Sequence, residues 1–226
     1  MLVPMRYAYL VSTLPFLAVW LILYARRKDL RKQMRFMSLF VALSGLIAEG
    51  LWWTVDWWHP PTITGTRVGL EDFLLGFTNG GVAAVLYETA FGKRLAKARV
   101  EKGHLAAMVL VTFAAMAISF WILHLTSFVS TVVALLAGGG AVLWYRRDLL
   151  SDALWSGFLM MALSIPVYWF MLWLAPEMID LVWDNAHLTG YRPVGIPIED
   201  LAFYFLTGFA AGPFYEYLRG ERLKDA

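Results

Sequence analysis

Seven apolar stretches, each bounded by charged or polar residues, constrain this 226-residue chain more than any other feature. A helix needs roughly 20 mainly apolar residues to cross a hydrocarbon core of about 30 Å. The stretches predict seven membrane-spanning helices, at 7–25, 36–56, 71–91, 104–124, 128–145, 154–175 and 198–218. Hydrophobic residues make up 60% of the chain, which is too apolar for an ordinary soluble domain. We therefore predict an all-α, polytopic membrane helical bundle, forming a single membrane domain over residues 1–226.

Basic residues are concentrated in alternate connections between these helices. Arg26, Arg27, Lys28, Arg31, Lys32 and Arg35 follow the first helix, and Lys93, Arg94, Lys97, Arg99 and Lys102 follow the third. The longer connections at 57–70 and 176–197 carry only Arg67 and Arg192 as Lys or Arg. Because loops rich in Lys and Arg stay in the cytoplasm, we predict an N-terminus outside and a cytoplasmic C-terminus, in the plasma membrane.

An internal repeat becomes visible when the sequence is shifted by 128 positions. The shift pairs Glu49 with Glu177, Asp56 with Asp184, His59 with His187, Glu71 with Glu199 and Asp72 with Asp200. We therefore predict two three-helix repeats, at 5–96 and 127–223, joined by an extra linking helix at 103–125. One additional helix keeps both copies in the same orientation, so the repeats are parallel and both acidic motifs face the external leaflet. This arrangement predicts one composite site.

Seven carboxyl groups within the repeated motifs are the candidate catalytic residues. They are Glu49, Asp56, Glu71, Asp72, Asp184, Glu199 and Asp200. Acidic residues at a helix start also gain about 0.3–1 kcal/mol by capping it, and this alternative applies to the motifs at 71–72 and 199–200. Ionisable groups within a membrane are costly and usually functional, however, and the motif occurs twice. We therefore favour a functional site.

Three further features have simpler interpretations. Glu88 and Glu216 lie close to basic residues, so we expect them to form ion pairs. The spacings Gly76-x-x-x-Gly80 and Gly208-x-x-x-Gly212 predict close packing between helices. The chain has no cysteine, which excludes disulfides and thiolate chemistry.

The motifs Gly69-Leu70-Glu71-Asp72 and Pro197-Ile198-Glu199-Asp200 are placed alike in the two repeats. Together with the Trp-rich external segments, they resemble the small, flavin-independent membrane lycopene cyclase domain. That family occurs as paired small subunits or as fused duplications, with a Pro-x-Glu-Glu or Pro-x-Glu-Asp motif. The resemblance covers most of the chain except the linking helix and the tail. The first copy departs from the pattern, with Gly69 in place of the proline.

The resemblance implies an intramolecular lyase or isomerase that cyclises the end group of lycopene, or of a related acyclic carotenoid, without net redox change. It implies carboxyl groups as acid and base, with no cofactor and no metal. Aromatic side chains would stabilise the carbocation, at about 0.5–2 kcal/mol each; the candidates are Trp52, Trp53, Phe73, Phe203 and Tyr204. The expected partners are a long apolar polyene and lipid, with no nucleic acid, and a homo-oligomer is compatible with the sequence.

Two other function classes remain open from the sequence. Paired acidic motifs could hold Mg²⁺ against a diphosphate in an intramembrane prenyltransferase, which would lose activity on chelation. Repeated intramembrane carboxyls could also serve a proton-coupled transporter or a lipid-binding membrane protein. Proton-coupled uptake without any change in a carotenoid would favour that third class.

Overall fold

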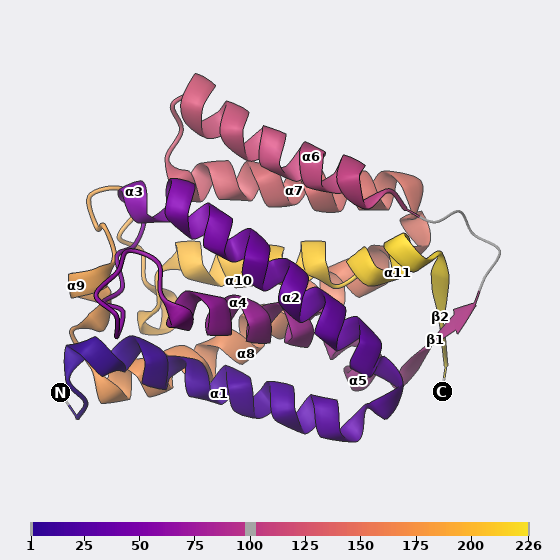
Figure 1. Ribbon diagram of the computed structural model, residues 1–226, viewed down its shortest axis with the longest axis horizontal. Helices are drawn as coiled ribbons and strands as arrows, with labels where there is room; N and C mark the ends of the chain where they lie inside the picture. The colour runs from indigo at the N-terminus through magenta and orange to yellow at the C-terminus, as the bar shows by residue number, and fades with distance from the viewer. Residues whose placement is uncertain (1, 98–102, 226) are drawn as a thin grey trace.

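The computed structural model describes residues 2–97 and 103–225, and it is a bundle of helices with one small sheet (Figure 1). The basic residues Arg99 and Lys102, which the predicted topology uses, lie outside the described residues. The predicted class, an all-α polytopic membrane bundle, is confirmed.

Among the residues that the structure describes, five apolar helical segments are long enough to cross a membrane, at 5–26, 28–56, 105–122, 127–145 and 147–174. They contain α1 (Met5–Arg26), α2 (Arg31–Ala48), α6 (Leu105–Ala117), α7 (Ser127–Tyr145) and α8 (Leu150–Leu174). A π-helical segment, Glu49–Trp53, extends α2 and leads into the short α3 (Thr54–Asp56). A second π-helical segment, Ile118–Ile122, ends α6. These segments correspond to five of the seven predicted spans.

The two remaining predicted spans are interrupted, so their prediction as continuous helices was wrong. The stretch 71–91 forms α4 (Leu70–Ala83) and α5 (Leu86–Ala90), while 198–218 forms α10 (Ile198–Ala211) and α11 (Phe214–Arg219). The break before α11 falls at Pro213, because proline lacks the N–H that would continue the helix. At 14 residues, α4 and α10 are each roughly 21 Å long, too short to cross alone.

Close glycine contacts hold α4 and α10 against the longer helices. A Cβ on Gly76 would lie 2.9 Å from the Ala42 Cα of α2, and one on Gly80 would lie 2.5 Å from the Met37 carbonyl oxygen. On α10, a Cβ on Gly208 would clash with the backbone of α8. The predicted role of these glycines in close packing is therefore confirmed, and α4 and α10 form the interior of the bundle.

The bundle has two chemically different ends, which we name by their contents. The motif end holds the starts of α4 and α10, with α9 (Met178–Val182), the 3₁₀ turn Pro193–Gly195 and the loops 57–69 and 183–197. The sheet end holds the 3₁₀ turns Lys28–Leu30 and Arg147–Leu149, and the antiparallel strands β1 (Lys93–Lys97) and β2 (Glu221–Asp225). The two ends lie at opposite sides of Figure 1.

The register of the sheet relates the two halves of the chain. Leu95 lies opposite Leu223, and these residues are 128 positions apart, the same shift that defines the sequence repeat. Antiparallel pairing centred on two equivalent residues is what a twofold axis through the sheet would produce. This pairing supports two parallel repeats, which stay a prediction.

Two arginines at the sheet end make matching contacts. Arg27 binds Asp29 at 2.8 Å and donates to the carbonyl oxygens of Glu88 and Lys93. Arg146 binds Asp148 at 2.8 Å and donates to the carbonyl oxygens of Glu216 and Glu221. Each arginine therefore joins a helix–helix turn to the strand that ends the same half of the chain.

Within residues 2–97 and 103–225, the Glu88 and Glu216 side chains do not form the expected ion pairs. Both are fully buried, and the side-chain amide of Gln33 donates to one oxygen of each at 2.8 Å. The second oxygen of each glutamate has no partner among the described residues. Asp152 of α8 is buried next to them and is bound by Ser156. A polar cluster made by both halves thus replaces the predicted surface ion pairs.

Candidate active site

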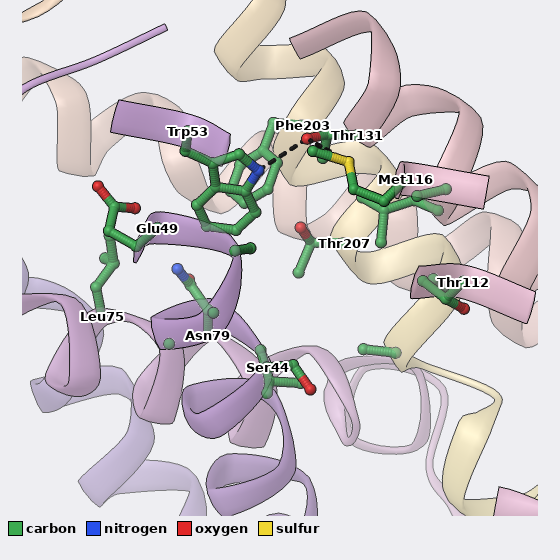
Figure 2. A pocket seen from close by; sticks show the side chains of 18 of the residues that line it. Ser44, Glu49, Trp53, Leu75, Asn79, Thr112, Met116, Thr131, Phe203 and Thr207 are labelled. Atoms are coloured by element: carbon green, nitrogen blue, oxygen red, sulfur yellow. Dashed lines mark hydrogen bonds between the residues drawn. The ribbon is translucent and has the colours of Figure 1, made fainter. Parts of the chain in front are cut away.

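A cavity of about 230 Å³ lies inside the bundle, between α2, α4, α6, α7 and α10. Its walls are mostly apolar, and three carboxyl groups line it: Glu49, Asp72 and Asp200. Figure 2 shows Glu49 at one end of the view and Thr112 at the other, with Asn79 and Thr207 between them. The cavity thus combines apolar walls with a small number of polar groups, as ligand sites do.

Helices α4 and α10 present the same helical face to this cavity. Residues at positions i, i+3, i+4 and i+7 lie on the same face of an α-helix. The lining residues follow this spacing on both helices: Asp72, Leu75, Gly76 and Asn79 on α4, and Asp200, Phe203, Tyr204 and Thr207 on α10. Each residue in the first set is 128 positions before its counterpart in the second. The two motif copies therefore contribute to one cavity.

Asp72 has a hydrogen-bond donor at each carboxyl oxygen. The Tyr9 hydroxyl of α1 donates to Oδ1 at 2.6 Å, and the Gly69 backbone N–H donates to Oδ2 at 2.7 Å. The second contact also caps α4, so the capping interpretation holds for this residue. Hydrogen bonds to both oxygens stabilise the ionised form of a carboxyl group. Asp72 therefore has a donor for each of its carboxyl oxygens.

Asp200 has a different environment, although it occupies the equivalent position. The residue equivalent to Gly69 is Pro197, which has no N–H to donate. Asp200 is 3% exposed, the Tyr168 and Trp183 side chains lie next to it, and its Oδ2 atom has no hydrogen-bond partner in the described part of the chain. A buried carboxyl oxygen without a donor suits the protonated form.

Glu49 is the third carboxyl group in the cavity. It is 1% exposed and sits at the start of the π-helical segment that extends α2. The Trp58 indole N–H donates to its Oε2 atom at 3.2 Å, while Oε1 has no partner within residues 2–97 and 103–225. Glu49 lies close enough to Asp72 for their charges to interact. Two carboxyls from one half of the chain thus face one from the other half.

Glu71 and Glu199 are buried outside the cavity lining, at the bases of the motif-end loops. Glu71 Oε1 accepts the Ile63 N–H at 2.6 Å, and Glu199 Oε1 accepts the Thr189 N–H at 2.6 Å. Each glutamate ties the loop before its own helix to the start of that helix. The first acid of each motif therefore anchors a loop, and the second faces the cavity.

The other two candidate carboxyls are also placed away from the cavity. Asp56 accepts the backbone N–H of Ser127 at 3.0 Å and the Ser127 hydroxyl, so it binds the start of α7. Asp184 lies in the loop at the motif end, where it binds His187 at 2.9 Å. This contact holds the pKa of the Asp184 carboxyl below its usual value. Both residues have structural contacts that explain them without catalysis.

Aromatic rings form much of the wall near the carboxyl groups. Phe203 contacts Trp53 and Trp57 edge to face, with ring centroids 5.4 and 5.3 Å apart. Trp52 and Tyr204, two other predicted substrate-binding residues, also line the cavity. Phe73 is not among the lining residues and stacks on Phe77 instead. Four of the five predicted aromatic residues therefore face this space.

The sequence analysis missed several polar residues of the site. Asn79 and Thr207 could have been found, because they lie about two helical turns after Asp72 and Asp200 and pair under the 128-residue shift. Tyr9 and Tyr168 gave no signal, because tyrosines in apolar helices are common. For metals, the described residues contain no group of three or more His, Cys, Asp or Glu side chains placed to hold an ion.

Fold and site together define a class: a polytopic helical membrane protein with a buried cavity that carries carboxyl groups and aromatic walls. The sequence matches the lycopene cyclase family over residues 6–90 and 121–218. The chain therefore belongs to the lycopene cyclase family. No curated protein and no solved structure matches it. The two matched segments contain both motifs, and the whole of α6 lies between them.

Proposed function

We propose that this protein cyclises the end group of lycopene, or of a related acyclic carotenoid, by acid–base catalysis in the cavity. The observation that carries the proposal is the placement of Glu49, Asp72 and Asp200 together in an apolar, aromatic-walled space. Within the described residues, none of the three forms a salt bridge. Carboxyl groups without cationic partners are suited to moving protons in a site that excludes water.

The reaction needs one proton donor and one proton acceptor, and it leaves the substrate composition unchanged. A proton adds to the terminal double bond of the acyclic end group, which leaves a tertiary carbocation. The nearby trisubstituted double bond attacks this cation, so one carbon–carbon bond closes the ring and the charge moves to a ring carbon. Loss of a proton from an adjacent carbon restores a double bond. No electrons enter or leave the system.

The different environments of the two aspartates suggest which group does what. Asp200 has an oxygen without a donor, so we assign it the role of the acid. Asp72 accepts two hydrogen bonds, so we assign it the role of the carboxylate that balances the cation and removes the ring proton. Phe203 and Tyr204 follow Asp200 on the same helical face, where their rings can stabilise the cation at about 0.5–2 kcal/mol each.

A single composite cavity limits the reaction to one end of the substrate at a time. A C40 carotenoid is about as long as the hydrocarbon core is thick, so its second end lies far from these carboxyls. Two rings would then require release and reversal of the substrate. Labelled lycopene should pass through a free monocyclic intermediate, and a dicyclic product formed in one residence would contradict the single site.

The proposal is tested by expressing the protein in a lycopene-accumulating host. The wild-type chain should convert lycopene to cyclic carotenoids, and Asp200→Asn should lower the rate by about 10²–10⁴-fold. The matched control is Asp180→Asn, at an exposed position in α9. Unchanged lycopene with a well-folded wild-type protein would refute the proposal. Transfer of a prenyl group from a diphosphate that is lost on chelation of divalent ions, without ring formation on lycopene, would favour the prenyltransferase instead.

A further inference from the structure

Two interfaces between helices, α1 with α8 and α7 with α2, are equivalent under the internal repeat, and we call them seams. Their packing differs. Helix α1 packs along α8, whereas the main contact of α7 with the α2 segment is at the π-helical residues Glu49–Trp53. There the Trp53 indole N–H donates to the Thr131 hydroxyl at 2.8 Å. Farther from the motif end, residues of α2 and α7 line opposite walls of the cavity. The cavity therefore occupies the open seam between α2 and α7.

The cavity is long and follows α2. Its lining on this helix runs from Glu49 back to Met37, which is 12 residues or roughly 18 Å of helix. The carboxyl groups lie at the motif end of this path, and Phe40 and Phe214 stack near its other end at 5.0 Å. A lining that extends over this length fits an extended apolar chain better than a compact ligand.

One long side of this path is bordered by α6, the helix that belongs to neither repeat. Helix α6 lies beside α7 and contributes Val109, Thr112 and Phe113 to the lining (Figure 1). On the facing helix α2, Val41, Ser44 and Gly45 line the cavity, and all six residues are partly exposed. Both sides are therefore partly accessible, as an opening between α2 and α6 toward the lipid requires.

We propose that the polyene substrate enters and lies in this seam, with one end group at the carboxyls and the unreacted part leaving between α2 and α6 into the bilayer. The proposal rests on the proposed function for the identity of the ligand. The cavity, at about 230 Å³, is smaller than the roughly 300–1,000 Å³ of pockets that enclose a drug-sized ligand. A C40 molecule therefore cannot be enclosed whole and has to extend beyond the opening.

Gly45 is a position in the seam where a side chain can be added without a clash at its Cβ atom. A Cβ on Gly45 would meet no atom within 4 Å, although this residue lines the cavity. It lies one helical turn from Glu49, on the path that the substrate would follow. Gly140 of α7 is the matched control, because a Cβ there also meets nothing within 4 Å but the residue is outside the lining.

The experiment measures how much lycopene stays bound to the purified protein, using the absorbance of the polyene. Both substitutions, Gly45→Phe and Gly140→Phe, are made in an Asp72→Asn background, so that turnover does not remove the ligand. We expect Gly45→Phe to lower the bound lycopene at least about tenfold at a ligand concentration that half saturates the background protein. Gly140→Phe should retain the background amount, and Gly45→Ala should lose less than Gly45→Phe.

The outcomes separate this proposal from the proposed function. Equal retention by Gly45→Phe and Gly140→Phe, with both proteins monodisperse, would overturn the seam as the binding path, whether or not the wild type forms rings. Retention that depends on Gly45, in a protein whose wild type leaves lycopene acyclic, would support the binding path and refute the cyclase. If Gly45→Phe is not monodisperse, Val109→Phe, which narrows the same opening from α6, takes its place with the same expected loss.

Discussion

The neighbouring acids Glu71 and Asp72 should respond very differently to the removal of their charge. Asp72→Asn retains the shape of the side chain but removes the carboxylate that faces the cavity. Loss of a general base typically slows a reaction about 10²–10⁴-fold, which corresponds to about 3–5 kcal/mol in the barrier. Glu71→Gln retains an oxygen that can accept the Ile63 N–H, so the loop stays anchored. We expect its rate of ring formation per folded molecule to stay within about threefold of wild type, since Glu71 is not among the residues that line the cavity.

The assay is the initial rate of ring formation on lycopene in isolated membranes, divided by the amount of monodisperse protein. This normalisation removes any effect on folding yield. Glu71→Ala is the third variant: it leaves the Ile63 N–H without its acceptor, so it should cost about 1–3 kcal/mol of stability while the rate per folded molecule is retained. A loss in Glu71→Gln as large as that in Asp72→Asn would show that the assignment of the two acids is wrong.

Three further predictions concern residues outside the cavity lining. Asp56→Ala removes the acceptor at the start of α7 and should lower the unfolding free energy by about 0.5–2 kcal/mol without changing the rate per folded molecule; a loss of rate at unchanged stability would make Asp56 catalytic. Gln33→Leu leaves two buried glutamates without their shared donor and should destabilise the bundle by at least about 1–3 kcal/mol, measured as a lower thermal midpoint in detergent. The contact with His187 holds the pKa of Asp184 below its usual value of about 3.9. The contact therefore stabilises the folded loop at pH values above about 3.9, and this stabilisation is lost as the pH falls through the lowered pKa. Hydrogen exchange of the loop should therefore differ between wild type and His187→Ala at about pH 5, by less than about 1 kcal/mol because both groups are partly exposed, and the difference should vanish near pH 3 or below.

The departure from the family motif at Gly69 gains a physical meaning from the structure. In the first copy the glycine N–H binds Asp72, whereas Pro197 in the second copy has no N–H for Asp200. One difference between the copies therefore gives two aspartates with different hydrogen bonding, one with a donor at each oxygen and one with an unpaired oxygen within the described residues. Two equivalent aspartates would be less suited to separate acid and base steps.

The sequence alone determined that the chain lies in a membrane, that it is helical, and which residues form the motif. Long apolar stretches exclude a water-soluble fold, and helices are the simplest way to satisfy backbone hydrogen bonds in lipid. Glycine spacing predicted close packing correctly, because the absence of a Cβ is a local property that needs no knowledge of the partner helix. The helical period places Glu49, Trp52, Trp53 and Asp56 on one face. The first three line the cavity, whereas Asp56 binds Ser127.

Only the tertiary structure decided which acids share a space and which ones anchor loops. Glu71 and Asp72 are adjacent in sequence, yet they point to different surroundings, since successive helical residues are turned by about 100°. Whether an oxygen meets a donor depends on chain segments far away, such as Tyr9 for Asp72 and Gln33 for the glutamates at the sheet end. The sequence also did not reveal that the helices break after α4 and α10. Apolar composition indicates that a segment is buried or lies in lipid, but not that it forms one continuous helix. The sequence thus determines the local helical preference and the membrane environment, while the pairing of buried polar atoms depends on three-dimensional packing.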